Sequence, residues 1–224
     1  MKRDLIVTCE HGGFRVPAAY RSLFRGRGAV LSSHRGWDPG ALELARRFRA
    51  PLLFSTTTRL LVELNRSPGH PRLFSEFTRD LDAAAKTRLI ARHYLPYRAA
   101  VESAVRARRS VLHLSSHSFT PVLDGEVRRM DVGLLYDPAR RGEAAFCARW
   151  RAALLRLRPD LVVARNAPYR GTADGLVTHL RRTFGESRYL GIELEVNQKR
   201  MGGAGGPWRA LQRDLVASFR TAAG

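Results

Sequence analysis

The chain has 224 residues and a hydrophobic content of 44%, which suits one soluble globular domain with a substantial core. Its two cysteines, Cys9 and Cys147, provide neither a disulfide framework nor a cysteine-based zinc motif, so any metal would need His, Asp or Glu ligands. The net charge of +19 suggests a phosphate-binding surface, but the arginines are scattered through segments with helical spacing. No RNA-binding aromatic motif accompanies them, so the charge predicts a basic surface that attracts small anionic substrates.

No stretch of the sequence approaches the roughly 20 apolar residues of a membrane span. The charged residues 1–4 lead into only a short apolar run, which differs from an export signal. The sequence therefore predicts a protein of the cytoplasm without a membrane partner. It leaves the oligomeric state open.

Short apolar runs alternate with stretches of helical spacing along the chain. Runs with the length and turn-like flanks of strands cover residues 5–9, 51–54, 60–64, 111–115, 132–136, 161–164 and 189–196. Helices are predicted over residues 39–48, 79–108, 142–157, 175–183 and 207–222, with a break near Leu95 caused by Pro96. This alternation predicts a single α/β domain over residues 1–224, with a mainly parallel sheet flanked by helices.

Two histidines stand where predicted strands end. His11 follows the run 5–9, and His117 lies where the run 111–115 opens into a loop. Because parallel strands display their chemistry at their carboxyl ends, the pair predicts one shared metal site. Hydrolytic zinc sites use about three protein ligands and leave a position for water. Asp38, on a loop that opens a helix, is the third candidate, although an Asp there is also a good N-cap.

Two other residues are alternative metal ligands. His34 lies close to Asp38 in the sequence. Glu10 neighbours His11 on an extended segment and is expected to point to the opposite side.

The last predicted strand carries two acids, Glu193 and Glu195, which share one face because they are two residues apart. Acids on an otherwise hydrophobic strand indicate either a solvated edge or a functional site. A hydrolase needs a base that takes a proton from water and returns it to the leaving amine. Glu195 is nearer the strand end and is the predicted base, with Glu193 as the alternative.

Asn65 and Arg66 follow the run 60–64, at another predicted strand end. An arginine can clamp a carboxylate with two parallel hydrogen bonds, and Arg66 or Arg59 would bind a substrate carboxylate or a developing oxyanion. An exposed turn explains the same residues equally well, since Asn, Ser, Pro and Gly all form turns.

These motifs, in chain order, resemble those of the N-formylglutamate amidohydrolase family. They cover residues 7–13, 37–41, 59–66, 94–97, 117–121, 166–171 and 193–196. The resemblance implies a zinc-carboxypeptidase-like (phosphorylase/hydrolase-like) α/β fold. It also implies zinc-dependent hydrolysis of an N-formyl or N-acyl amino acid, with formylglutamate giving formate and glutamate as the type reaction.

Carried over by position, the resemblance implies a role for each matching residue. His11, Asp38 and His117 would surround Zn²⁺, and Glu195 would be the base. Asn65 and Arg66 would hold the substrate carboxylate, and the pocket would be lined by Asn166, Tyr169 and Arg170. His179 falls where the family often has a histidine, here on a predicted amphipathic helix.

One departure and two alternative functions accompany this interpretation. The chain has Glu195-Val196-Asn197 where the family pattern has Glu-x-Arg, which leaves the acyl-group and side-chain preference open. Cell-wall amidases have similar His-Gly-Gly and Asp-Pro-Gly-Ala elements, but there they share one loop, whereas His11 and Asp38 are 27 positions apart. A non-enzymatic, basic nucleic-acid-binding protein with structural histidines is the other alternative.

Overall fold

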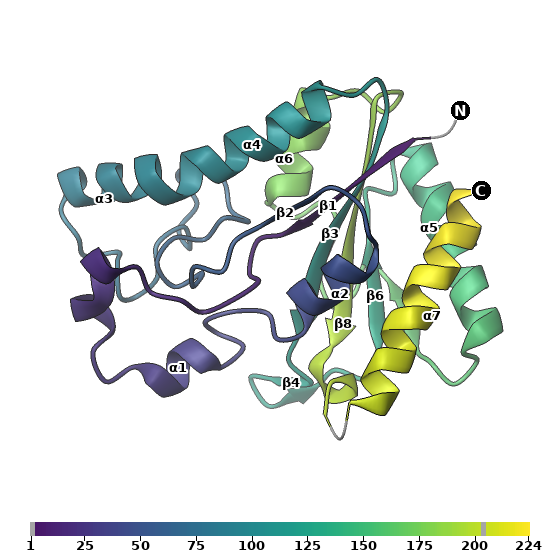
Figure 1. The fold of residues 1–224 in the computed structure, drawn as a ribbon, viewed down its shortest axis with the longest axis horizontal. Helices are drawn as coiled ribbons and strands as arrows, with labels where there is room; N and C mark the ends of the chain where they lie inside the picture. Colours follow the sequence, from purple (N-terminus) through teal and green to yellow (C-terminus); the bar gives the residue numbers. More distant parts are fainter. Residues whose placement is uncertain (1–2, 203–204) are drawn as a thin grey trace.

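A computed structural model describes residues 3–202 and 205–224 of the chain (Figure 1). Its main sheet has six strands in the order β2-β1-β3-β8-β6-β7. Neighbouring strands run parallel, except β6 and β8, which are antiparallel. The strands are β1 (Asp4–Cys9), β2 (Leu52–Phe54), β3 (Val111–Phe119), β6 (Val132–Leu135), β7 (Val163–Arg165) and β8 (Tyr189–Asn197), and a separate hairpin joins β4 (Val122–Leu123) to β5 (Glu126–Val127).

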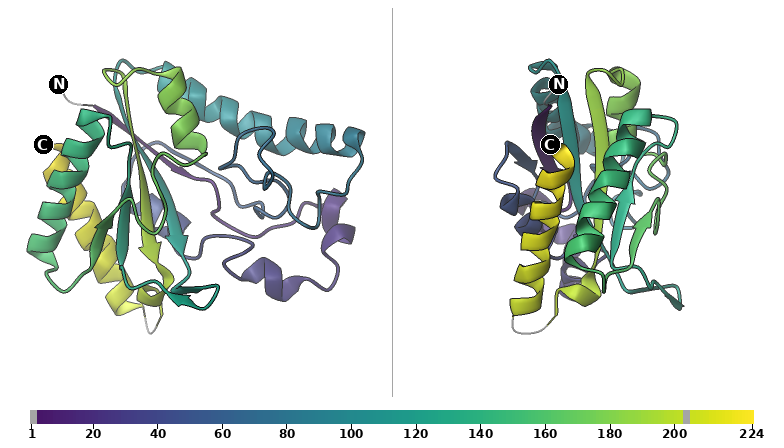
Figure 2. Two further views of the ribbon diagram at one scale, coloured as in Figure 1. Left: turned by 180° about the vertical axis from the view of Figure 1, so that it is seen from behind. Right: turned by 90° about the vertical axis from the view of Figure 1, so that its right-hand side faces the viewer.

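Helices cover both faces of this sheet (Figures 1 and 2). One face packs on α2 (Ala41–Arg47), α5 (Arg141–Leu157) and α7 (Gly206–Ala223), and the other on α4 (Leu95–Arg106) and α6 (Leu176–Thr183). The two faces enclose separate hydrophobic clusters. In β1, Val7 belongs to the first cluster and Ile6 to the second, as the alternation of a strand requires. The predicted fold class, one α/β domain with a mainly parallel mixed sheet flanked by helices, is confirmed.

The face that packs on α4 and α6 changes from apolar to ionisable side chains along the two central strands, β3 and β8. At their amino ends it carries Val111 and Tyr189, which join the hydrophobic cluster. Towards the carboxyl ends, the same face carries His117 on β3 and Glu193 and Glu195 on β8, with His117 paired in register with Glu195. The alternation therefore brings three ionisable side chains to one buried face.

The chain order explains why this end of the sheet is open. β2 and β3 lie on opposite sides of β1, and the helices that precede them, α2 and α4, cover opposite faces. Such a switch in direction leaves a crevice outside the carboxyl ends of the strands, where α/β proteins bind their ligands. His11, directly after β1, and His117, near the end of β3, both lie at this crevice.

The predicted strand over residues 60–64 is wrong. These residues form turns, in which the Leu61 amide donates to the Thr58 carbonyl (3.1 Å) and the Glu63 amide to the Leu73 carbonyl (2.9 Å). The run is apolar because it is buried in a third hydrophobic cluster, away from the sheet. Around this cluster lie a 3-10 helix (Ala18–Phe24), α1 (Gly28–Ser32), α3 (Ala83–Leu89) and the π-helical turn Ile90–Tyr94.

The remaining predicted strands and helices all have a counterpart in the structure. The predicted break near Leu95 takes the form of the π-helical turn directly before Pro96, where a wider turn accommodates a residue without an N–H group. His117 lies inside β3 and not in a loop, because pairing with β8 continues to Phe119. The hairpin and three short helices, Ala18–Phe24, α1 and Gln198–Arg200, were not predicted.

Across the described ranges, none of the helices combines the length and the apolar character that a bilayer crossing requires.

A buried ion pair joins the helices to the sheet on the side away from the crevice. Glu143 of α5, which is fully buried, accepts hydrogen bonds from the amide of Gly191 on β8 (3.0 Å) and from Nε of Arg181 on α6 (3.1 Å). We expect Glu143→Ala to lower the free energy of unfolding by about 3 to 5 kcal/mol, because it leaves the Arg181 charge buried without its partner. Urea denaturation of the purified variant measures this change.

The matched control is Glu126→Ala, which removes an exposed acid from the hairpin and is expected to change the unfolding free energy by less than about 0.5 kcal/mol. Equal urea midpoints for the two variants would contradict the role given to Glu143.

Candidate metal centre and active site

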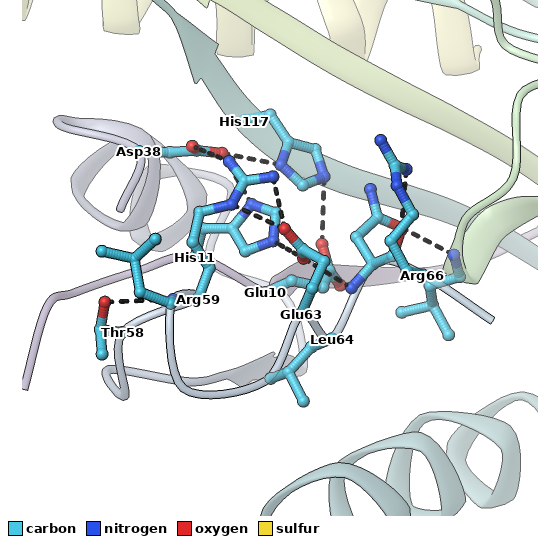
Figure 3. Close-up of polar contacts among 12 residues, drawn as sticks. Glu10, His11, Asp38, Thr58, Arg59, Glu63, Leu64, Arg66 and His117 are labelled. Atoms are coloured by element: carbon cyan, nitrogen blue, oxygen red, sulfur yellow. Dashed lines mark hydrogen bonds and ion pairs between the residues drawn. The ribbon is translucent and has the colours of Figure 1, made fainter. Parts of the chain in front are cut away.

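The structure brings the three predicted metal ligands together (Figure 3). His11, Asp38 and His117 are all buried, and one potential ligand atom of each lies within 4.8 Å of the others. Asp38 Oδ2 is 3.1 Å from His11 Nδ1 and 2.9 Å from His117 Nδ1. The two imidazoles thus turn the same nitrogen towards one carboxylate oxygen, although they come from segments that are far apart in the sequence.

Backbone contacts fix the loops that carry two of these ligands. The Asp38 amide donates to the His11 carbonyl (2.9 Å), and the Gly12 amide donates to the Ser55 carbonyl (2.9 Å). A Cβ at Gly12 would stand only 2.9 Å from that same Ser55 oxygen, so the approach requires glycine. The N-cap of α2 is Gly40 and not Asp38, so the Asp38 side chain is directed to the histidines and does not cap the helix.

The far nitrogens of both imidazoles meet carboxylates. His117 Nε2 lies 3.1 Å from Glu10 Oε2 and 2.8 Å from Ser115 Oγ, while His11 Nε2 contacts Glu63 Oε1. Metal-bound histidines commonly donate their second ring N–H to a carboxylate, which fixes the tautomer and raises the basicity of the ligand. Glu10 therefore supports His117 from the side opposite to Asp38.

The Glu10 carboxylate has further hydrogen bonds. It accepts from Tyr97 OH (2.9 Å) and from Ser115 Oγ (2.7 Å). Burial alone would raise the pKa of Glu10, but its contacts with His117 and Ser115 outweigh this effect and lower it well below its ordinary value. Glu10 is thus an ionised carboxylate.

Glu63 and Arg59 form the other support of the site. Arg59 Nε donates to Glu63 Oε2 (2.7 Å), and Nη1 donates to Asp38 Oδ1 (3.1 Å). Burial opposes ionisation of Glu63, but Arg59 and His11 outweigh it and lower its pKa. Sequence reasoning missed Glu63, although an acid inside the buried run 60–64, four residues after an arginine, was an available signal.

The donor set fits a divalent cation. Three buried carboxylates, of Glu10, Asp38 and Glu63, face one arginine, Arg59, so neutral histidines leave the cluster with an excess of negative charge. Buried charges require compensation, and a divalent metal held by His11, Asp38 and His117 would supply it. Two imidazole nitrogens and a carboxylate oxygen are typical ligands of hydrolytic zinc.

A cavity of about 250 Å³ opens beside this group. Every predicted site residue lines it except Asn166. Asn166 holds the neighbouring loop, because its Oδ1 accepts from the amides of Tyr136 (2.9 Å) and Gly171 (3.1 Å). Two other histidines lie elsewhere: His34, the alternative ligand, lines an adjoining cavity, and His179 on α6 lies 3.7 Å from Glu102.

Both acids of β8 face the cavity. β8 lies between β3 and β6, so the alternative of a solvated edge is excluded. Burial raises the pKa of Glu195 to about 8. The nearby Asp38 and Glu193 contribute to the rise, whereas His117 opposes it. Within the described ranges Glu195 Oε2 has no hydrogen-bond partner, whereas Glu193 Oε2 accepts from Asn65 Nδ2 (3.4 Å).

Three arginines of the cavity wall, Arg66, Arg72 and Arg170, pair with no carboxylate in the part of the chain that the structure describes. Arg66 Nη1 donates to the carbonyl of Asp174 (2.7 Å), which holds the side chain at the wall. Both polar atoms of the Asn65 side chain are hydrogen-bonded: Nδ2 donates to Glu193, and Oδ1 accepts from the Leu176 amide at the start of α6 (2.7 Å). The same cavity is thus lined by guanidinium groups without a carboxylate partner and by the unpartnered Glu195 carboxylate.

Metal-ligating side chains at the carboxyl ends of central strands, beside a buried acid and with cationic side chains around one cavity, are the arrangement of a hydrolase. The model of the N-formylglutamate amidohydrolase family matches residues 3–201. The chain therefore belongs to the N-formylglutamate amidohydrolase family and is a hydrolase that acts on amides.

Two solved structures are similar over almost the whole chain. A gene product from Agrobacterium tumefaciens is 28% identical, with a TM-score of 0.82 over 99% of this chain and 90% of that one. N-formylglutamate amidohydrolase from Ralstonia eutropha is 23% identical, with a TM-score of 0.65 over 99% of this chain and 93% of that one. At this identity, the second similarity shows the shared fold alone. No curated protein matches the chain.

Proposed function

We propose that the protein is a zinc-dependent amidohydrolase of the cytoplasm that cleaves an N-formyl or N-acyl amino acid. N-formylglutamate, which would give formate and glutamate, is the type substrate. The observation that supports this most directly is the convergence of His11, His117 and Asp38 beside the unpartnered carboxylate of Glu195. We further propose that residues 1–224 act as one domain.

In this proposal, His11 Nδ1, His117 Nδ1 and a carboxylate oxygen of Asp38 hold the metal. When bound, zinc polarises the scissile carbonyl and lowers the pKa of a water molecule to about 7. Glu10 and Glu63 keep the far ring nitrogens protonated, so that both imidazoles offer Nδ1 as the ligand atom. Arg59 orients Asp38 and Glu63 and acts through them.

Glu195 is the proposed general base and acid. It takes a proton from the attacking water and returns it to the nitrogen of the leaving amine. A pKa of about 8, raised by burial, suits a group that must both accept and release a proton near neutral pH. The bond from Asn65 to Glu193 favours Glu195 over Glu193 for this role.

The substrate is proposed to be an anionic amino-acid derivative. Arg66 and Arg170 would bind its carboxylate, and Tyr169 would contact its side chain from the cavity rim. Asn65 would position the acids of β8, and Asn166 would position the loop that carries Tyr169 and Arg170. A purely nucleic-acid-binding function agrees less well with a family of hydrolases.

Exchanging the base and exchanging a metal ligand have different expected results. Glu195→Gln should lower kcat by about 10² to 10⁴-fold with the zinc content unchanged, because only proton transfer is lost. His117→Ala should lose both turnover and bound zinc, because a ligand is removed. Elemental analysis and a formate-release assay on N-formylglutamate measure the two properties. Full turnover in either variant would refute the role proposed for that residue.

Glu63→Gln tests the support behind His11. The amide keeps the shape of the side chain but removes the charge that His11 Nε2 and Arg59 contact, so zinc affinity should fall by about 10 to 100-fold. Competition with a chelator measures the affinity. Glu76→Gln, which removes a more exposed acid paired with Arg35, is the control and should leave the affinity unchanged. The same affinity in both variants would count against the proposed metal site.

Arg66→Ala tests the proposed carboxylate clamp. We expect KM for N-formylglutamate to rise by about 10 to 100-fold with a smaller change in kcat, because a charge-assisted hydrogen bond to substrate is lost. Arg182→Ala removes an exposed arginine of α6 and should leave KM as in the parent protein. Steady-state kinetics measure KM and kcat for both variants. An unchanged KM in Arg66→Ala would exclude a role of Arg66 in binding the substrate carboxylate.

A further inference from the structure

A second and larger cavity adjoins the one at the metal group. It has a volume of about 530 Å³, against about 250 Å³ for the first. The two cavities share six lining residues, which are Asp38, Arg59, Arg72, Ser118, Leu123 and Tyr169. Side chains that line both spaces make them neighbouring compartments of one cleft.

The second compartment combines apolar side chains with charged ones. Its three acids, Asp38, Glu63 and Glu76, are paired with Arg59 and Arg35, which leaves Arg72 and Arg79 as the further cations of the wall. Leu60 and Phe119 are buried in its wall, and Phe74 is half-buried beside them. Arg79 lines this compartment and not the first one. Its ion pair with Asp80 (3.8 Å) is weak, because both side chains are exposed to solvent. The compartment therefore suits a group with an apolar body and an anionic end.

The roles proposed above determine which part of a substrate would lie in each compartment, and this inference rests on those roles. Glu195, which must protonate the leaving amine, lines only the first compartment, as does Arg66. The amino-acid part of the substrate therefore occupies the first compartment. Asp38 and Arg59 line both compartments, so the acyl part, on the other side of the scissile bond, extends past them into the second.

A formyl group is too small to use this space, since it consists of one carbon with its oxygen and hydrogen. We propose that the preferred substrates are N-acyl amino acids whose acyl group has an apolar body and an anionic end. Phe74, Phe119 and Leu60 would pack against the body, and Arg72 and Arg79 would bind the anionic end.

The reaction is an ordinary amide hydrolysis. The acyl carbon loses its bond to nitrogen and gains a bond to the water oxygen, and the proton taken by Glu195 goes to the amine. One carboxylic acid and one amino acid result, and no further reactant is needed.

The test compares four glutamate derivatives on the zinc-loaded protein: N-formyl, N-acetyl, N-benzoyl and N-(4-carboxybenzoyl). We expect kcat/KM to be highest for the 4-carboxybenzoyl compound, at least about tenfold above the formyl compound. Arg79→Ala should lower kcat/KM for the 4-carboxybenzoyl compound by about tenfold or more, and should leave the formyl and benzoyl compounds unchanged. Arg182→Ala serves as the exposed-arginine control.

Two results overturn the inference in different ways. If the formyl compound is hydrolysed best, or if Arg79→Ala affects all four compounds equally, the extended acyl group is excluded while the amidohydrolase activity stands. If none of the four is hydrolysed, the proposed function fails and this inference fails with it.

Discussion

The compensation of buried negative charge is the constraint on which the site depends. Glu10, Asp38 and Glu63 come from three separate loops, and all three carboxylates are excluded from water. Each must find positive charge or hydrogen-bond donors, because a buried, unpaired carboxylate is costly. Arg59, the imidazoles and neighbouring hydroxyl groups contact these carboxylates, and a divalent metal would compensate the remaining negative charge. The contacts that hold the loops therefore also assemble the ligand group.

The carboxylate of Glu195 is also buried, but it lacks the partners that the other three carboxylates have. Its position in the sheet explains this difference. Because β8 is paired with a strand on each side, backbone hydrogen bonds hold Glu195 beside His117. No contact of the Glu195 side chain is needed to fix its position. Its carboxylate therefore stays without a donor at Oε2, and burial raises its pKa. Loops thus carry acids whose pKa values are lowered by fixed partners, whereas the central strand carries the acid that is proposed to exchange a proton.

Sequence reasoning identified much of this site because residues at strand ends are local features. Apolar runs locate β1, β3 and β8, and the residues after or within them bring His11, His117 and Glu195 to one edge. The run 60–64 was misassigned because burial in a loop produces the same apolar composition as a strand, and only tertiary contacts distinguish the two. Glu63 was missed for a related reason, since its partner His11 lies 52 positions away.

The distribution of charge also restricts how an anion can lie in the cleft. The possible metal ligands, the acids of β8 and the arginines Arg66 and Arg170 all line the first compartment. On the proposed mechanism, a substrate with its carboxylate at these arginines turns its amide towards Glu195. The reversed orientation would bring that carboxylate beside Glu193 and Glu195, which offer it no positive charge. On this proposal, the strong basic charge of the chain would select one orientation of an anionic substrate as well as attract it.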